Sequence, residues 1–377
     1  MKEIALVTTS YPDRIAESGR QAAGAFVADF AAALAQHVRV RVIAAADEDH
    51  VEENGRLSVV RFAVPRRPLS LLRANNPADW WNIAVSLSAG QRAVAAVAGG
   101  GGLDHIFALW TLPSGYWARV VGRRHGVPYS TWALGSDIWS LARVPVVGSV
   151  LRSVLRGASH RFADGLVLAD DVSRIAEMPC SFLPSSRKLA VQPVPRRVAP
   201  PYRLAFLGRW HENKGADLLI DALDQLDDLR WSKIEEVRYC GGGPMQELVR
   251  AGVARLQRAG RPLRLAGYLD REQATELYSW ADYLILPSRV ESIPVIFSDA
   301  MQCGVPLIAT PVGDLRRLLD AYGVGVLAEC PTADALSAAI GRALDGSPAS
   351  LSDGLARARC DFDVTAAARK FYETVAG

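Results

Sequence analysis

The sequence predicts an α/β protein built from two doubly wound domains. Short β-branched runs alternate with longer amphipathic stretches along both halves of the chain, and this alternation is typical of βαβ units with parallel sheets. The halves are separated by residues 184–202, which hold five prolines and no acid. We therefore expect a first domain over 1–183, a linker over 184–202 and a second domain over 203–360.

The first half opens with a strand over 4–8 that ends in a turn at Tyr11-Pro12. A helix follows Gly24, because apolar residues recur at the spacing of an amphipathic helix from Phe26 to Leu34. The same reading predicts strands at 38–44, 58–64, 105–109, 129–132 and 165–168, and helices at 83–98 and 115–125.

The second half repeats the alternation. It predicts strands at 204–207, 236–240, 263–265, 283–286 and 305–310, and helices at 215–226, 245–259 and 271–280. A further helix begins after Pro294, whose fixed φ suits a first helical turn. That helix carries Asp299 inward and ends near Gly304.

Composition excludes several classes of protein. The 377 residues carry a net charge of only +3 and no basic tail, which gives no indication of nucleic-acid binding. The five cysteines are far apart and never form a CxxC pair, so we expect reduced thiols in the cytoplasm and no zinc site. No run of about 18 apolar residues predicts a spanning helix.

Two cations follow the first strand of the second half. Arg209 lies at the strand end, and Lys214 precedes the next helix. Fixed cations near a helix N-terminus can neutralise a diphosphate without a metal, although both could equally be ordinary solvated charges. Glycine-rich strand exits at 240–244 and 265–269 could approach a ligand or be plain turns.

Two carboxylates lie in the stretch 286–315. Glu291 is in the turn after a strand, and Asp299 is in the following helix. Parallel strands place such turns at the carboxyl edge of the sheet, where open α/β folds bind ligands. The alternative for Asp299 is an interaction with the positive end of its own helix.

The order of these features resembles the retaining glycosyltransferases of family 4, which have the GT-B fold of two Rossmann-like domains with a cleft between them. The resemblance implies that Arg209 and Lys214 hold the donor diphosphate, Glu291 lies by the donor sugar, and Asp299 binds the ribose. It also implies that the last helix, within 361–377, completes the first domain. Further donor contacts implied by the resemblance are Gly24, Gly208, Gly242, Gly267, Tyr268, Leu269, Ser292, Ile293, Pro294 and Val295.

The first half matches that family less completely. Leu134 stands where many relatives carry a histidine facing the donor sugar. Trp110, Ser136 and Asp137 are the candidate acceptor-side residues, with loop capping as the alternative for the last two. Six tryptophans crowd into this half, and we expect most of them in the core: Trp80, Trp81, Trp110, Trp117, Trp132 and Trp139.

The resemblance implies transfer of a sugar from a UDP- or GDP-linked donor to an acceptor hydroxyl, with retention, in polysaccharide, glycolipid or other glycoconjugate biosynthesis. It implies no metal and no cofactor. We expect the acceptor to be a sugar, a lipid-linked molecule or a small molecule. A nucleotide-sugar epimerase and a non-catalytic nucleotide-sugar-binding subunit are the alternatives. Basic and apolar residues at 66–73 and 141–161 could contact anionic lipid from the cytoplasmic side, or simply pack as amphipathic helices.

Overall fold

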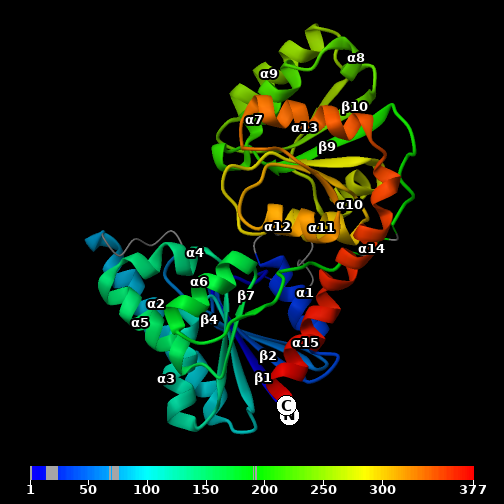
Figure 1. Cartoon of the computed structure of the whole chain (residues 1–377). Coiled ribbons are helices and arrows are strands. Elements are labelled where there is room, and N and C mark those ends of the chain that lie inside the picture. Colours follow the sequence, from blue (N-terminus) through cyan, green and yellow to red (C-terminus); the bar gives the residue numbers. More distant parts are fainter. Residues whose placement is uncertain (1, 14–23, 68, 70–75, 190, 192) are drawn as a thin grey trace. The chain divides into compact units, whose positions relative to one another are not determined.

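A computed structural model describes residues 2–13, 24–67, 69, 76–189, 191 and 193–377, without the side chains of Ser136, Arg143 and Pro145. The chain divides into two compact units, residues 1–187 with 364–377 and residues 188–363. Each unit is a doubly wound α/β domain built on a largely parallel sheet (Figure 1), which confirms the predicted fold class.

The first unit holds a sheet of eight strands in the order β3-β4-β2-β1-β5-β6-β7-β8. Only the hairpin of β3 and β4 is antiparallel. The strands are β1 Glu3–Thr8, β2 Arg39–Ala46, β3 His50–Asn54, β4 Leu57–Ala63, β5 His105–Leu109, β6 Tyr129–Ala133, β7 His160–Ala163 and β8 Ser181–Phe182. Strand β2 lies on one side of β1 and β5 lies on the other, so the topological switch lies between β1 and β5.

Helices cover both faces of this sheet. Those described are α1 Ala25–Leu34, α2 Trp80–Gly99, α3 Ser114–His125, α4 Ser136–Trp139, α5 Pro145–Gly157, α6 Leu166–Ala176 and α15 Val364–Ala376, with 3-10 turns η3 Pro77–Asp79 and η4 Leu141–Arg143. The C-terminal helix α15 lies beside α1 (Figure 1). Its Phe371 stacks on Phe107 of β5 with ring centroids 3.9 Å apart.

The strand predicted over 165–168 is wrong. Those residues start helix α6, and the strand at this place is β7. The apolar run Leu166-Val167-Leu168 has the composition of a strand, but Leu168, Val172 and Ala176 are buried at a spacing of four. That spacing belongs to one face of a helix, and a window of four residues was too short to show it.

The second unit holds a fully parallel sheet of six strands in the order β11-β10-β9-β12-β13-β14. These are β9 Tyr202–Arg209, β10 Ile234–Gly242, β11 Leu263–Ala266, β12 Tyr283–Leu286, β13 Leu307–Ala309 and β14 Gly325–Leu327. The topological switch lies between β9 and β12. Ligands of open α/β sheets bind outside the carboxyl ends of the strands at such a point.

The helices of this unit are α7 Ala216–Asp224, α8 Asp228–Trp231, α9 Gln246–Arg258, α10 Arg271–Trp280, α11 Val295–Gln302, α12 Leu315–Tyr322, α13 Ala333–Asp345 and α14 Ser352–Asp361, with 3-10 turns η5 Glu212–Lys214 and η6 Pro348–Leu351. Helices α7, α9 and α13 share a hydrophobic core with the sheet. No helix in the described ranges is both long enough and apolar enough to cross a membrane.

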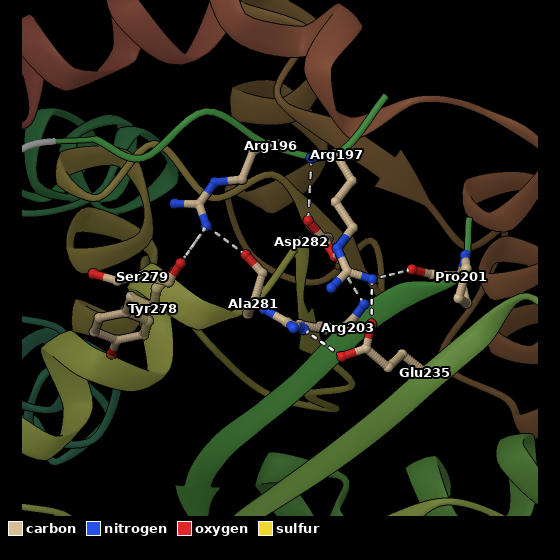
Figure 2. A network of polar contacts seen from close by, with 9 residues as sticks. All are labelled: Arg196, Arg197, Pro201, Arg203, Glu235, Tyr278, Ser279, Ala281 and Asp282. Carbon is tan, nitrogen blue, oxygen red and sulfur yellow. Dashed lines mark hydrogen bonds and ion pairs between the residues drawn. The ribbon is translucent and has the colours of Figure 1, made fainter. Parts of the chain in front are cut away.

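The end of the proline-rich segment is bonded into the second unit. The Arg196 guanidinium donates to backbone carbonyls at the ends of α10 and α11, including Tyr278 at 3.0 Å, Gly304 at 2.9 Å and Cys303 at 2.6 Å. Arg197 pairs with Glu235, whose carboxylate also accepts from Arg203 at 2.7 Å (Figure 2). A cation at a helix C-terminus complements the helix dipole, and Arg196 serves two helices at once.

Candidate functional site

Lys214 and Glu291 meet at the topological switch of the second unit. Lys214 lies in the loop after β9, and Glu291 lies in the turn after β12. Although they are 77 positions apart, the Lys214 ammonium donates directly to the Glu291 carboxylate. Ser288 donates to the same oxygen at 3.3 Å. Lys214 and Glu291, which the resemblance places beside the donor, therefore form one ion pair at the edge where such folds bind ligands.

Arg209 ends β9 in register with Gly242 of β10. Its side chain is exposed, and within the described ranges it makes no ion pair. Gly208 pairs with Gly241, where an added Cβ would lie 1.9 Å from the Gly208 carbonyl oxygen. Glycine is required there because the two strand ends approach so closely. The arrangement leaves the Arg209 guanidinium available to an anion.

The two glycine-rich strand exits predicted separately from the sequence lie side by side. The Gly241 N–H donates to the Gly267 carbonyl at 3.0 Å. The Tyr268 ring lies over Gly242, where an added Cβ would come within 2.6 Å of the ring. Tyr268 is 71% exposed and Leu269 follows it in the same loop. An exposed aromatic ring that packs against a glycine offers a surface on which a flat base can stack.

The segment from Ser292 to Val295 leads from Glu291 into α11. The Asp314 N–H donates to the Ser292 carbonyl at 3.2 Å, and Ile293 is buried. Pro294 caps α11 without any side-chain hydrogen bond, and the helix starts at Val295. The first N–H groups of α11 therefore lie close in the chain to Glu291.

Asp299 points inward from α11, as predicted, and is completely buried. Its carboxylate accepts a hydrogen bond of 3.1 Å from the Tyr278 hydroxyl of α10. The first turn of α11 contains no acid, so the alternative of a contact between Asp299 and the positive end of its own helix is not supported. The predicted contact with a ribose remains a prediction, and in this structure Tyr278 uses part of the carboxylate.

The carboxyl edge of the first sheet is organised by Asp137. This side chain is buried and accepts from the backbone N–H of Thr111 at 2.6 Å and of Leu134 at 3.2 Å. Burial raises the pKa of Asp137 above its usual range. The carboxylate thus ties together the turns after β5 and β6, which is the loop-capping alternative rather than a free acceptor contact. The side chain of Ser136 lies outside the described part of the chain.

Trp110 and Gly24 flank the same edge. Trp110 adopts a left-handed backbone conformation with φ 65°, and its half-buried ring meets Phe26 edge-on at 6.3 Å. Such a conformation is uncommon for a bulky residue and is concentrated at functional sites. Gly24 precedes α1 and lies against Ser10 and Tyr11.

The expectation that most of the six tryptophans are core is only partly correct. Trp117 and Trp132 are completely buried, and Trp139 donates to Asp171 at 2.9 Å. Trp80 and Trp81, at the start of α2, are 60% and 76% exposed. The sequence placed them just before the helix predicted over 83–98, and that position did not indicate whether their side chains would be buried or exposed.

The second unit is similar in sequence to a family of sugar-transferring enzymes. Residues 201–346 match the family model for glycosyl transferases group 1. The chain is 27% identical over 259 residues to TuaC of Bacillus subtilis, named as a teichuronic acid biosynthesis glycosyltransferase, covering 63% of this chain and 61% of that protein. It is 33% identical over 175 residues to a D-inositol 3-phosphate glycosyltransferase of Xylanimonas cellulosilytica, covering 45% of this chain and 38% of the relative. The chain thus spans less than two thirds of either relative.

Solved structures share the fold over the whole chain. Sucrose-phosphate synthase from Thermosynechococcus elongatus aligns with a TM-score of 0.71 at 18% identity, covering 99% of this chain and 98% of that one. Anabaena HepE in complex with UDP aligns at 0.69 and 16% identity, covering all of both chains. These similarities show that the chain has the GT-B fold.

The described residues also limit the sites for a metal. Across the described ranges, no group of three or more His, Cys, Asp or Glu side chains is placed so that it could hold a metal ion.

Proposed function

We propose that the protein is a retaining glycosyltransferase that moves a sugar from a nucleoside diphosphate sugar to an acceptor hydroxyl in glycoconjugate biosynthesis. The single observation that carries the proposal is the Lys214–Glu291 pair at the switch point of the second unit. The pair joins the exit of β12 to the exit of β9, which also carries the exposed cation Arg209, within the stretch similar to glycosyl transferases group 1. This arrangement offers two cations and one acid to a sugar diphosphate.

In this proposal the two cations act on the leaving group. Breaking the bond between sugar and diphosphate builds negative charge on the phosphate oxygens. Arg209 and Lys214 stabilise that charge because fixed cations need no reorganisation during the reaction. They take the part that a metal plays in other sugar transferases, and the reaction needs no metal or cofactor. Glu291 orients the sugar, and the leaving phosphate serves as the base for the acceptor hydroxyl on the same face.

The donor is proposed to be UDP- or GDP-linked. Support comes from the fold neighbour crystallised with UDP and from the exposed Tyr268 ring on Gly242, a surface suited to a base. The acceptor is a sugar, a lipid-linked molecule or a small molecule. The first unit is proposed to supply its binding surface around Trp110.

A panel of nucleotides and sugar nucleotides tests the proposal. Thermal shifts with UDP, GDP and ADP identify the nucleotide, and incubation of the matching sugar nucleotide with candidate acceptors identifies transfer. Nuclear magnetic resonance of the product reports the anomeric configuration, which must equal that of the donor. A new epimer formed from UDP-N-acetylglucosamine alone indicates an epimerase instead. Binding of none of the nucleotides contradicts the proposal altogether.

Peripheral contact with anionic lipid is a second part of the proposal. The exposed Trp80 and Trp81 lie next to the half-exposed Arg66, whose guanidinium is 3.6 Å from Asp79. Tryptophan rings prefer the membrane interface, and nearby cations attract anionic headgroups. Trp81→Ser should reduce co-sedimentation with phosphatidylglycerol vesicles severalfold. Leu229→Ser, which changes an apolar residue of the second unit that is 70% exposed, is the control, and equal sedimentation of both variants contradicts the contact.

A further inference from the structure

Arg289 joins the two loops that carry Lys214 and Glu291. It lies two residues before Glu291, in the turn after β12, and its guanidinium forms a fork with the Asp217 carboxylate. The two bonds measure 2.8 Å from Nη1 to Oδ1 and 2.7 Å from Nη2 to Oδ2. Asp217 is in the first turn of α7, three residues after Lys214. Neither residue stands out in the sequence as a candidate for the site.

Further bonds connect the same two loops. The Arg289 guanidinium also donates to the Glu212 carbonyl at 2.9 Å. The backbone N–H groups of Arg289 and Val290 both donate to the Asn213 carbonyl, at 2.8 Å and 3.3 Å. Every one of these acceptors lies within five residues of Lys214. The turn before Glu291 is therefore bonded to the loop around Lys214 from both its backbone and its side chain.

The direction of the guanidinium limits what Arg289 can do. Three of its five N–H groups donate to Asp217 and to the Glu212 carbonyl, and the Arg289 and Asp217 side chains are only 29% and 22% exposed. A planar fork matched to a carboxylate is stronger and more directional than a single surface ion pair. Arg289 is thus committed to holding protein groups rather than serving as a third cation for the diphosphate.

We infer that Arg289 is a positioning residue that, together with Asp217, keeps the Lys214 ammonium and the Glu291 carboxylate in contact. Only the identity of what this pair binds rests on the proposed function; the joining of the two loops does not. Lysine cannot replace this arginine, because one ammonium cannot span both carboxylate oxygens and the Glu212 carbonyl in the same plane.

Hydrogen exchange of the unliganded protein tests the joining of the loops. Arg289→Lys and Asp217→Asn should each raise the exchange rate of peptides over 210–215 and 288–292 at least severalfold. Peptides over 240–244, which make none of these bonds, should not change. Arg261→Lys is the matched control, because Arg261 pairs with Asp228 at 2.7 Å before β11, at the opposite edge of the sheet. Unchanged exchange over 210–215 in both variants overturns the inference.

Nucleotide titration tests the consequence for binding. With whichever of UDP, GDP and ADP binds the wild type, Arg289→Lys and Asp217→Asn should each weaken affinity about tenfold. The double variant should weaken it by no more than either single change, because both remove the same contact. Additive losses near a hundredfold, or unchanged affinity in Arg289→Lys, overturn the inference. A wild type that binds none of the three nucleotides refutes the proposed function, while the exchange experiment still decides whether the loops are joined.

Discussion

Replacing Lys214 is the most direct test of the proposed donor site. Lys214→Ala removes one cation from the phosphates and leaves Glu291 with Ser288 as its remaining described hydrogen-bond partner. A hydrogen bond to a charged group contributes roughly 1.5–3 kcal/mol, so affinity for a nucleoside diphosphate should fall about 10- to 150-fold. We expect the lower part of this range, because the Lys214 side chain is 37% exposed and must first leave Glu291.

The same geometry predicts the opposite change in affinity when Glu291, the partner of Lys214, is replaced. Glu291→Gln removes the charge that competes for Lys214, so nucleoside diphosphate binding should be retained or strengthened while sugar transfer is lost. A purely structural pair would lose binding in both variants.

Isothermal titration with UDP, GDP and ADP measures both changes. Lys233→Ala is the matched control, because Lys233 also pairs with an acid, Asp345, in the same unit. Lys233 lies before β10, at the amino edge of the sheet. The reasoning is refuted if Lys214→Ala binds as tightly as the wild type, or if Lys233→Ala loses as much affinity as Lys214→Ala.

Two further predictions concern the backbone and pH. Gly215→Ala should lower the free energy of unfolding by about 2 kcal/mol or more, because Gly215 has φ 65° and an added Cβ would lie 1.8 Å from the Pro287 carbonyl oxygen. Gly260 has φ 77° with open space around it, so Gly260→Ala should lower the free energy of unfolding by less. Urea denaturation measures both changes, and equal losses would exclude the clash. Asp137 has a pKa raised by burial above 3.8, so it holds its proton more tightly when folded. Its contribution to the free energy of unfolding is therefore complete below about pH 3.8 and is lost as the pH rises through the raised pKa. Asp137→Asn should flatten the urea stability profile above about pH 3.8, and a profile parallel to that of the wild type would contradict the assignment.

The sequence predicted those features of the fold and of the candidate site that depend on local pattern. The alternation of strands and helices predicted the doubly wound units, and the strand exits predicted that Lys214 and Glu291 would lie on one edge. Their direct contact could not be predicted, because it depends on which strands are neighbours. Arg289 and Asp217 were missed for the same reason, since each looks like an ordinary surface charge until β9 and β12 are placed side by side.

Two other differences have a different physical origin. The sequence offered both an acceptor contact and loop capping for Asp137, because its bonds to Thr111 and Leu134 depend on backbone N–H directions that residue type alone does not determine. The exposure of Trp80 and Trp81 shows that a large apolar side chain does not require burial when it lies at the start of a surface helix.

The contacts of Arg196 decide where the second unit can be cut from the chain for separate expression. A fragment that begins at Tyr202, the first residue of β9, lacks the guanidinium that binds the carbonyl ends of α10 and α11. Those carbonyls would then face solvent at the ends of the helices that carry Tyr278 and Asp299. A fragment starting at Lys188, where the second unit begins, keeps Arg196 and Arg197 together with their acceptors (Figure 2). The proline-rich segment, expected from its composition to be a linker, therefore supplies part of the stability of the second unit.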